Sequence, residues 1–114
     1  MPTIRLGDIA YARSGDKGAG ANIGVIAFSP AGYEILRESL SAMAVEKFFA
    51  PMGPGRVVRY ELPYLSALNF LLPTILSGGG SMSLRIDAQG KALGQAILEM
   101  PIDVPENIPA EVSP

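Results

Sequence analysis

Glycine is concentrated in one short segment of this chain, and that segment constrains the fold more than any other. Four glycines lie within ten positions. Glycine adopts backbone conformations that other residues avoid, so this density is typical of a turn or loop. Loose alternation predicts a strand over residues 5–13, and the apolar run at 22–28 predicts a buried strand, so the segment between them is expected to be a loop. Its residues are Ser14-Gly15-Asp16-Lys17-Gly18-Ala19-Gly20-Ala21-Asn22-Ile23-Gly24.

A helical region follows these two strands. Ser29 and Pro30 predict a helix start, because a serine hydroxyl caps the first turn and proline lacks an N–H that would be unpaired there. Apolar residues continue at helical spacing as far as Phe48. Ser41 could cap a fresh start, so both one helix and two short helices stay open. Clean alternation then predicts a strand over residues 56–62.

Proline and glycine divide the rest of the chain. Pro63 predicts the start of a second helix, which the stretch Gly78-Gly79-Gly80 would end. Residues 81–86 predict a strand, and residues 87–90 predict a tight turn. Residues 91–100 are compatible with a helix or a strand, and the preceding turn favours a strand.

The predicted order of elements is β-β-α-β-α-β-β. This order is typical of an α+β domain, a two-layer sandwich in which helices cover one face of a mainly antiparallel sheet. With 114 residues, the chain suffices for one domain. We expect this domain over residues 1–102, followed by a proline- and acid-rich tail over residues 103–114 that is extended or disordered.

The composition excludes several classes of function. The chain has no cysteine and no histidine, which rules out a thiolate nucleophile, a Ser-His-Asp triad and a zinc site built on these ligands. We therefore expect no metal and no cofactor. A net charge of −2 gives no electrostatic footprint for nucleic acid. No signal peptide and no apolar stretch long enough for a bilayer is found, so the prediction is a cytoplasmic protein without a membrane anchor.

The balance of apolar and charged residues indicates that the chain associates with a copy of itself or with another protein. Hydrophobic residues make up 48% of the chain and charged residues only 18%, against a usual charged share of about 25%. A small domain with this bias is expected to hide apolar surface against a copy of itself or a partner. A homo-oligomer is the prediction, with a well-packed monomer as the alternative.

The glycine-rich segment also predicts a binding site. Glycines let backbone N–H groups approach an anion, Lys17 supplies a positive charge, and Asn22 can donate and accept hydrogen bonds. A P-loop and a dinucleotide fingerprint are both excluded, because each has a different spacing and leads into a helix. A plain hairpin loop with a solvated lysine stays open as the alternative. The candidate ligand-binding residues here are Ser14, Gly15, Asp16, Lys17, Gly18, Asn22 and Gly24.

Residues outside this segment could complete the site. Arg13 could bind a carboxylate or phosphate through two parallel hydrogen bonds, or pair with Asp8 or Asp16 instead. Asn69 could reach the same site or satisfy a backbone group. The second glycine-rich stretch, with its Gly79-Gly80 pair, could close over a ligand or serve as a flexible connector.

Several strings of residues resemble one known family. They are Gly7-Asp8-Ile9-Ala10-Tyr11-Ala12-Arg13-Ser14-Gly15-Asp16-Lys17-Gly18, Asn22-Ile23-Gly24, Tyr60-Glu61-Leu62-Pro63, Ala67-Leu68-Asn69-Phe70, Gly78-Gly79-Gly80 and Ser83-Leu84-Arg85-Ile86-Asp87-Ala88-Gln89-Gly90-Lys91-Ala92-Leu93-Gly94-Gln95. Over residues 5–102 the chain resembles the AtuA-like ferredoxin-fold family, which takes its name from a protein of acyclic terpene utilisation. The resemblance implies a ferredoxin-like sandwich and a place in acyl-CoA-type catabolism of terpenoids or branched compounds. It also implies a larger domain as partner, which would here be a separately encoded AtuA-like chain, and it implies no particular reaction.

Three functions stay open at this point. The first is an accessory binding module or subunit that holds an anionic small molecule at residues 14–24. The second is a small metal-independent enzyme in which Asp16 or Lys17 acts as acid or base. The third is a structural oligomerisation domain.

Overall fold

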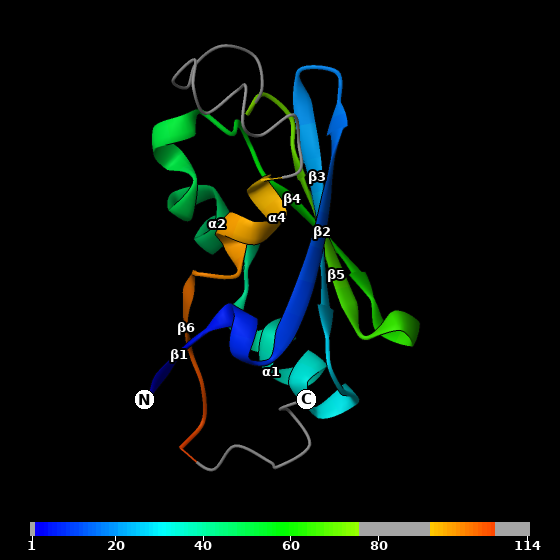
Figure 1. The fold of residues 1–114 in the computed structure, drawn as a ribbon, viewed down its shortest axis with the longest axis vertical. Coiled ribbons are helices and arrows are strands. Elements are labelled where there is room, and N and C mark those ends of the chain that lie inside the picture. Colours follow the sequence, from blue (N-terminus) through cyan, green and yellow to red (C-terminus); the bar gives the residue numbers. More distant parts are fainter. Residues whose placement is uncertain (1, 76–91, 107–114) are drawn as a thin grey trace.

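A four-stranded antiparallel sheet forms the frame of the molecule. The computed structural model describes residues 2–75 and 92–106 (Figure 1). The strand order in the sheet is β2-β3-β5-β4, and a separate antiparallel pair, β1 with β6, joins the two ends of the described chain. The strand bounds are β1 Thr3–Arg5, β2 Ala10–Lys17, β3 Gly20–Ala27, β4 Val58–Leu62, β5 Ala67–Leu72 and β6 Pro101–Asp103.

Helices cover one face of this sheet. In Figure 1, α2 and α4 lie on the same side of the sheet, and α1 packs against β3 and β5. Three short 3-10 turns connect elements within the described residues. The bounds are η1 Leu6–Asp8, α1 Pro30–Ser39, α2 Ala42–Phe48, η2 Ala50–Met52, η3 Pro63–Leu65 and α4 Ala92–Ile97.

The helical region after β3 is two short helices, each with its own serine cap. Ser29 Oγ accepts a hydrogen bond from the Gly32 N–H, and Pro30 occupies the first turn of α1. Ser41 Oγ accepts in the same way from the Ala44 N–H at the start of α2. Each cap satisfies an N–H that the helix itself leaves unpaired, and the two starts are those that the sequence indicates.

The glycine-rich segment is a β-hairpin, so the prediction of a long loop is wrong. β2 and β3 pair without interruption from Ala10 opposite Ala27 to Lys17 opposite Gly20. The turn between the strands contains only Gly18 and Ala19, and Gly18 has a φ of 61°. A two-residue hairpin turn requires positive φ, which glycine adopts without strain, so one glycine makes the turn and the others lie within strands.

The predicted second helix is instead a strand. Pro63 opens the 3-10 turn η3, Ser66 takes a φ of 52°, and β5 begins at the next residue. β5 lies between β3 and β4, where Leu68, Phe70 and Leu72 are fully buried. The leucines of this segment have helical spacing, but β5 forms backbone hydrogen bonds with a strand on each side. This pairing, together with burial of its side chains, favours the strand.

Two further element predictions are corrected. The strand predicted over residues 91–100 is the helix α4, packed against β2. The strand predicted over residues 5–13 is divided by η1, so that Arg5 ends β1 and β2 starts at Ala10. Both changes place apolar side chains in the core, since Leu6, Ile9, Leu93 and Ile97 are all buried.

The class predicted from the sequence is confirmed: the chain is an α+β domain with a mostly antiparallel sheet, consistent with a ferredoxin-like fold. The predicted strand at 81–86, the turn at 87–90 and the second glycine-rich stretch lie outside the described residues. Asp103 ends β6, and Val104 is buried with its N–H donating to the Pro2 carbonyl, so the packed domain includes two residues of the predicted tail. The tail from residue 107 onward is outside the description.

Candidate functional site

The face of the sheet opposite the helices is open, and the strand register aligns its side chains in rows. The central row runs from Arg13 through Gly24 and Asn69 to Tyr60. The row beside it contains Gly15, Asn22, Leu71 and Val58, and the row on the other side contains Tyr11, Ile26, Ala67 and Leu62. We call this surface the open face.

Arg13 is an exposed cation on the open face. The structure gives its guanidinium no hydrogen bond or ion pair within residues 2–75 and 92–106. The two alternative pairings do not occur, because Asp8 pairs with Arg5 and Asp16 lies on the opposite face of β2. A guanidinium with all five N–H donors unused suits a carboxylate or phosphate, which it can hold through two parallel bonds.

Two asparagines lie beside this arginine on adjacent strands. Asn22 Nδ2 donates a long hydrogen bond of 3.5 Å to Asn69 Oδ1, and both side chains are half-buried. That bond uses one donor of Asn22, which leaves its second N–H and the amide N–H groups of Asn69 for a ligand. Sequence reasoning proposed both residues, and the register brings them together although 46 residues separate them.

Gly24 has no side chain and leaves open space on the sheet surface between Arg13 and the two asparagines. A Cβ built at Gly24 would meet its nearest neighbours, the Arg13 carbonyl and Asn69 Oδ1, only at 3.8 Å. A Cβ at Gly15 would meet only Asn22 Oδ1, at 3.6 Å. Neither glycine is required by packing, so a small group could approach the backbone closely at this point.

The structure places other predicted residues away from the open face. Ser14 faces the helices, where its Oγ accepts a hydrogen bond of 2.8 Å from the Gly94 N–H of α4. Asp16 is exposed on that same side, and Gly18 lies at the tip of the hairpin. Ser14 therefore positions α4, and the predicted set of residues divides between two faces. The Lys17 side chain, like Gly79 and Gly80, lies outside the description.

The backbone of β3, the second half of the segment, cannot form the anion cradle that its glycines suggested. β3 is paired with β2 on one side and β5 on the other, so its N–H groups are used in the sheet. Gly20 is required by packing, because a Cβ there would lie 2.6 Å from the carbonyl oxygens of Leu72 and Pro73. Recognition on this face must come from side chains.

Tyr60 and Tyr11 are members of the open face that sequence reasoning did not propose for the site. Tyr60 is 51% exposed and ends the central row, next to Asn69. Tyr11 stacks on Phe28 with ring centroids 6.0 Å apart. The alternation in β4 indicated that Tyr60 shares a face with Val58 and Leu62, but only the register could show that this face also carries Arg13.

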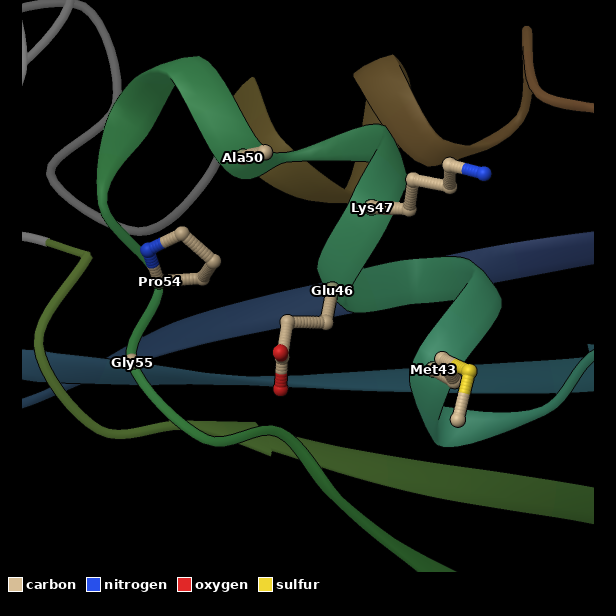
Figure 2. Close-up of a pocket in the computed structure, with 6 residues that line it drawn as sticks. All are labelled: Met43, Glu46, Lys47, Ala50, Pro54 and Gly55. Atoms are coloured by element: carbon tan, nitrogen blue, oxygen red, sulfur yellow. The ribbon is translucent and has the colours of Figure 1, made fainter.

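A separate hollow lies between α2 and the segment that leads to β4 (Figure 2). It has a volume of about 410 Å³ and is lined by Met43, Glu46, Lys47, Ala50, Pro54 and Gly55. The Glu46 side chain points toward the segment below it, and Oε1 accepts a hydrogen bond of 2.9 Å from the Val57 N–H. The Lys47 side chain points away from Glu46. Because the carboxylate already holds the chain in place, this hollow is a weaker candidate than the open face.

The part of the chain that the structure describes lacks two other features. It contains no group of three or more His, Cys, Asp or Glu side chains that could hold a metal ion. None of the helices in this part has the length and apolar character of a membrane span.

The fold and the open face define a small α+β domain with one covered and one exposed sheet surface. Comparison with protein-family models matches residues 4–103 to the AtuA ferredoxin-like domain. The chain belongs to this family, as the resemblance of its sequence implied. Comparisons with curated proteins and with solved structures gave no significant match.

Proposed function

We propose that this chain is an accessory binding module that holds an anionic group on its open face. Arg13 supplies the positive charge, and Asn22 and Asn69 supply neutral hydrogen-bond donors. The observation that carries the proposal is the register. It aligns an arginine that has no partner among the described residues, an open glycine and an asparagine on three neighbouring strands.

The spacing of the sheet supports a ligand of small size. Neighbouring strands lie about 4.8 Å apart, so Arg13 and Asn69 are separated by about 10 Å between their Cα atoms. Gly24 lies between them in the same row, and Asn69 Oδ1 lies 3.8 Å from a Cβ built at Gly24. A phosphate or carboxylate over Gly24 could accept from the guanidinium on one side and from an amide on the other.

Membership of the AtuA ferredoxin-like family supports a role for this module in acyl-CoA-type catabolism, which is what the resemblance implies. A phosphate of the coenzyme or a carboxylate of a branched metabolite would fit the proposed chemistry. A larger AtuA-like domain would be its partner. Catalysis by Asp16 is less well supported, because Asp16 lies on the helix side of β2, away from Arg13 and the asparagines.

Thermal unfolding with added ligands tests this proposal. The probes are inorganic phosphate, coenzyme A and a branched acyl-CoA, each in large excess. A ligand at about 100 times its dissociation constant adds roughly 2.7 kcal/mol to the free energy of unfolding, which raises the Tm by several degrees. We expect a shift with at least one probe and no turnover of it.

A pair of variants locates the effect. Arg13→Gln should abolish the shift, whereas Arg56→Gln removes the same charge from an exposed position before β4 and should leave it intact. No shift with any probe, or an equal loss in both variants, would contradict a site on the open face.

A further inference from the structure

The edge strand β4 presents an unpaired backbone and apolar side chains. It is the last strand in the order β2-β3-β5-β4, and its free side has no partner in the described chain. Val58, Tyr60 and Leu62 are 39%, 51% and 40% exposed, although strands with this alternation usually bury one face. No proline, lysine or bulge protects this edge over its five residues, and such an edge is a template for pairing with another strand.

The sequence of β4 is complementary to itself when read in the opposite direction. Its residues are Val58-Arg59-Tyr60-Glu61-Leu62. In an antiparallel pair of two copies centred on Tyr60, each Arg59 lies opposite the Glu61 of the other copy. Val58 likewise lies opposite Leu62, and Tyr60 lies opposite Tyr60. Opposite charges and apolar pairs at directly facing positions are the contacts that stabilise a sheet.

The two charged side chains have capacity for this second pairing. Arg59 Nη1 donates to the Arg37 and Leu40 carbonyls at 3.0 and 2.9 Å, and Nη2 donates to Glu61 Oε2 at 2.9 Å. These bonds use three of the five N–H donors of the guanidinium. They also hold it at a fixed place on the helix side of β4. Glu61 is 45% exposed, and its second carboxylate oxygen can accept from another arginine.

From this complementarity we infer that a second copy of the chain pairs with β4 about a two-fold axis near Tyr60. The two four-stranded sheets then join into one continuous antiparallel sheet of eight strands. Four charges alternate along the helix side of the seam, and apolar side chains meet on the open face. The inference does not depend on the anion site, since Arg13 lies at the other end of the row, on β2.

Face-to-face packing of two open faces is less favourable. Each open face carries Arg13, and none of the described acidic residues shares that face. Stacking would bury two guanidinium groups without a carboxylate partner, which is strongly unfavourable. Edge pairing leaves Arg13 exposed and brings the charges of β4 together with opposite sign.

Sedimentation equilibrium over micromolar to millimolar concentrations tests the pairing. A five-residue strand pair buries less than the roughly 800 Å² per partner of a standard interface, so we expect a reversible dimer with micromolar affinity. Glu61→Lys places a lysine opposite each Arg59 and should raise the dissociation constant about tenfold or more. Glu34→Lys makes the same charge change on α1, where Glu34 pairs with Arg37, and should leave the affinity unchanged.

Cross-linking gives an independent test, because the native chain contains no cysteine. Facing residues of an antiparallel pair lie about 4.5–5.5 Å apart between Cα atoms, which is within the range of a disulfide. Tyr60→Cys should therefore form a covalent dimer on mild oxidation. Met43→Cys, at a position on α2 that is 78% exposed, should not.

The outcomes separate the possibilities. The inference is supported if the chain forms a reversible dimer, Glu61→Lys raises its dissociation constant, and Tyr60→Cys cross-links it covalently. A monomer at all concentrations overturns it, and so does a dimer that Tyr60→Cys cross-links no better than Met43→Cys.

Discussion

The two faces of the four-stranded sheet differ in what their residues do. On the covered face, Ile23, Val25 and Phe70 are fully buried under the helices. On the open face, the same strands carry Arg13, Asn22 and Asn69, with glycines between them. Alternate residues of one strand thus serve stability and the candidate binding site, because successive side chains point to opposite faces.

This difference shows how two similar residues acquire unlike roles. Arg59 and Arg13 lie on opposite faces of one sheet. Arg59 is 21% exposed and donates to the last carbonyls of α1, so its role is structural. Arg13 makes no such bond within the described chain, so its charge is available to a ligand. The comparison predicts that substitutions on one face change stability and substitutions on the other change binding.

The largest effect is expected from a truncation on the covered face. Phe70→Ala removes a fully buried ring and should lower the free energy of unfolding by about 3–5 kcal/mol. Leu71→Ala, one residue further along β5 and on the open face, should lower it by less than half as much. Urea unfolding of both variants measures the difference, and equal losses would show that the open face is packed as well as the covered one.

The two arginines test the same division. Arg59→Gln removes three charge-assisted hydrogen bonds, which include the cap of α1, and should lower the free energy of unfolding by about 1.5–3 kcal/mol. Arg13→Gln should change it by no more than about 0.5 kcal/mol. Chemical denaturation provides both values. A large loss of stability in Arg13→Gln would mean that Arg13 has a structural role.

Glycines on β3 provide a third matched pair. Gly20→Ala brings a Cβ within 2.6 Å of two backbone carbonyl oxygens, and we expect a loss of about 1–3 kcal/mol. Gly24→Ala meets nothing closer than 3.8 Å, so its stability should stay within about 0.5 kcal/mol of the native value. Gly24→Ala should instead weaken the Tm shift given by the anionic probe, because the methyl group occupies the proposed ligand position. Thermal unfolding with and without the probe measures both effects.

The smallest expected effect has the opposite sign. Tyr33 on α1 is 4% exposed, and its hydroxyl has no hydrogen-bond partner in the described part of the chain. Removing an unpaired buried polar group is favourable, so Tyr33→Phe should raise the free energy of unfolding by up to about 1 kcal/mol. A decrease in the denaturation midpoint would show that the hydroxyl has a partner in solution.

Local chemistry explains which parts of the fold could be predicted. Three predicted features each depend on only a few neighbouring residues. They are the serine caps at Ser29 and Ser41, the proline in the first turn of α1 and the alternation of β4. The turn glycine, Gly18, lies in the segment that the sequence marked, although the turn proved far shorter than expected. The sequence also indicated Arg13, Asn22 and Gly24 as candidates, from their residue types and their place in or beside the glycine-rich segment. Asn69 was a candidate as part of a predicted helix, and it is a residue of β5 instead.

By itself, then, the sequence determined the class of fold, the serine caps that start α1 and α2, the family and the residue types of the candidate site. The tertiary structure decided that residues 67–72 form a strand, since a short apolar run fits a helix or a strand until its neighbours pair with it. It also decided that Ser14 turns toward α4 while Arg13 turns away. Which residues share a face depends on strand register, and register depends on contacts between segments that lie far apart in the sequence.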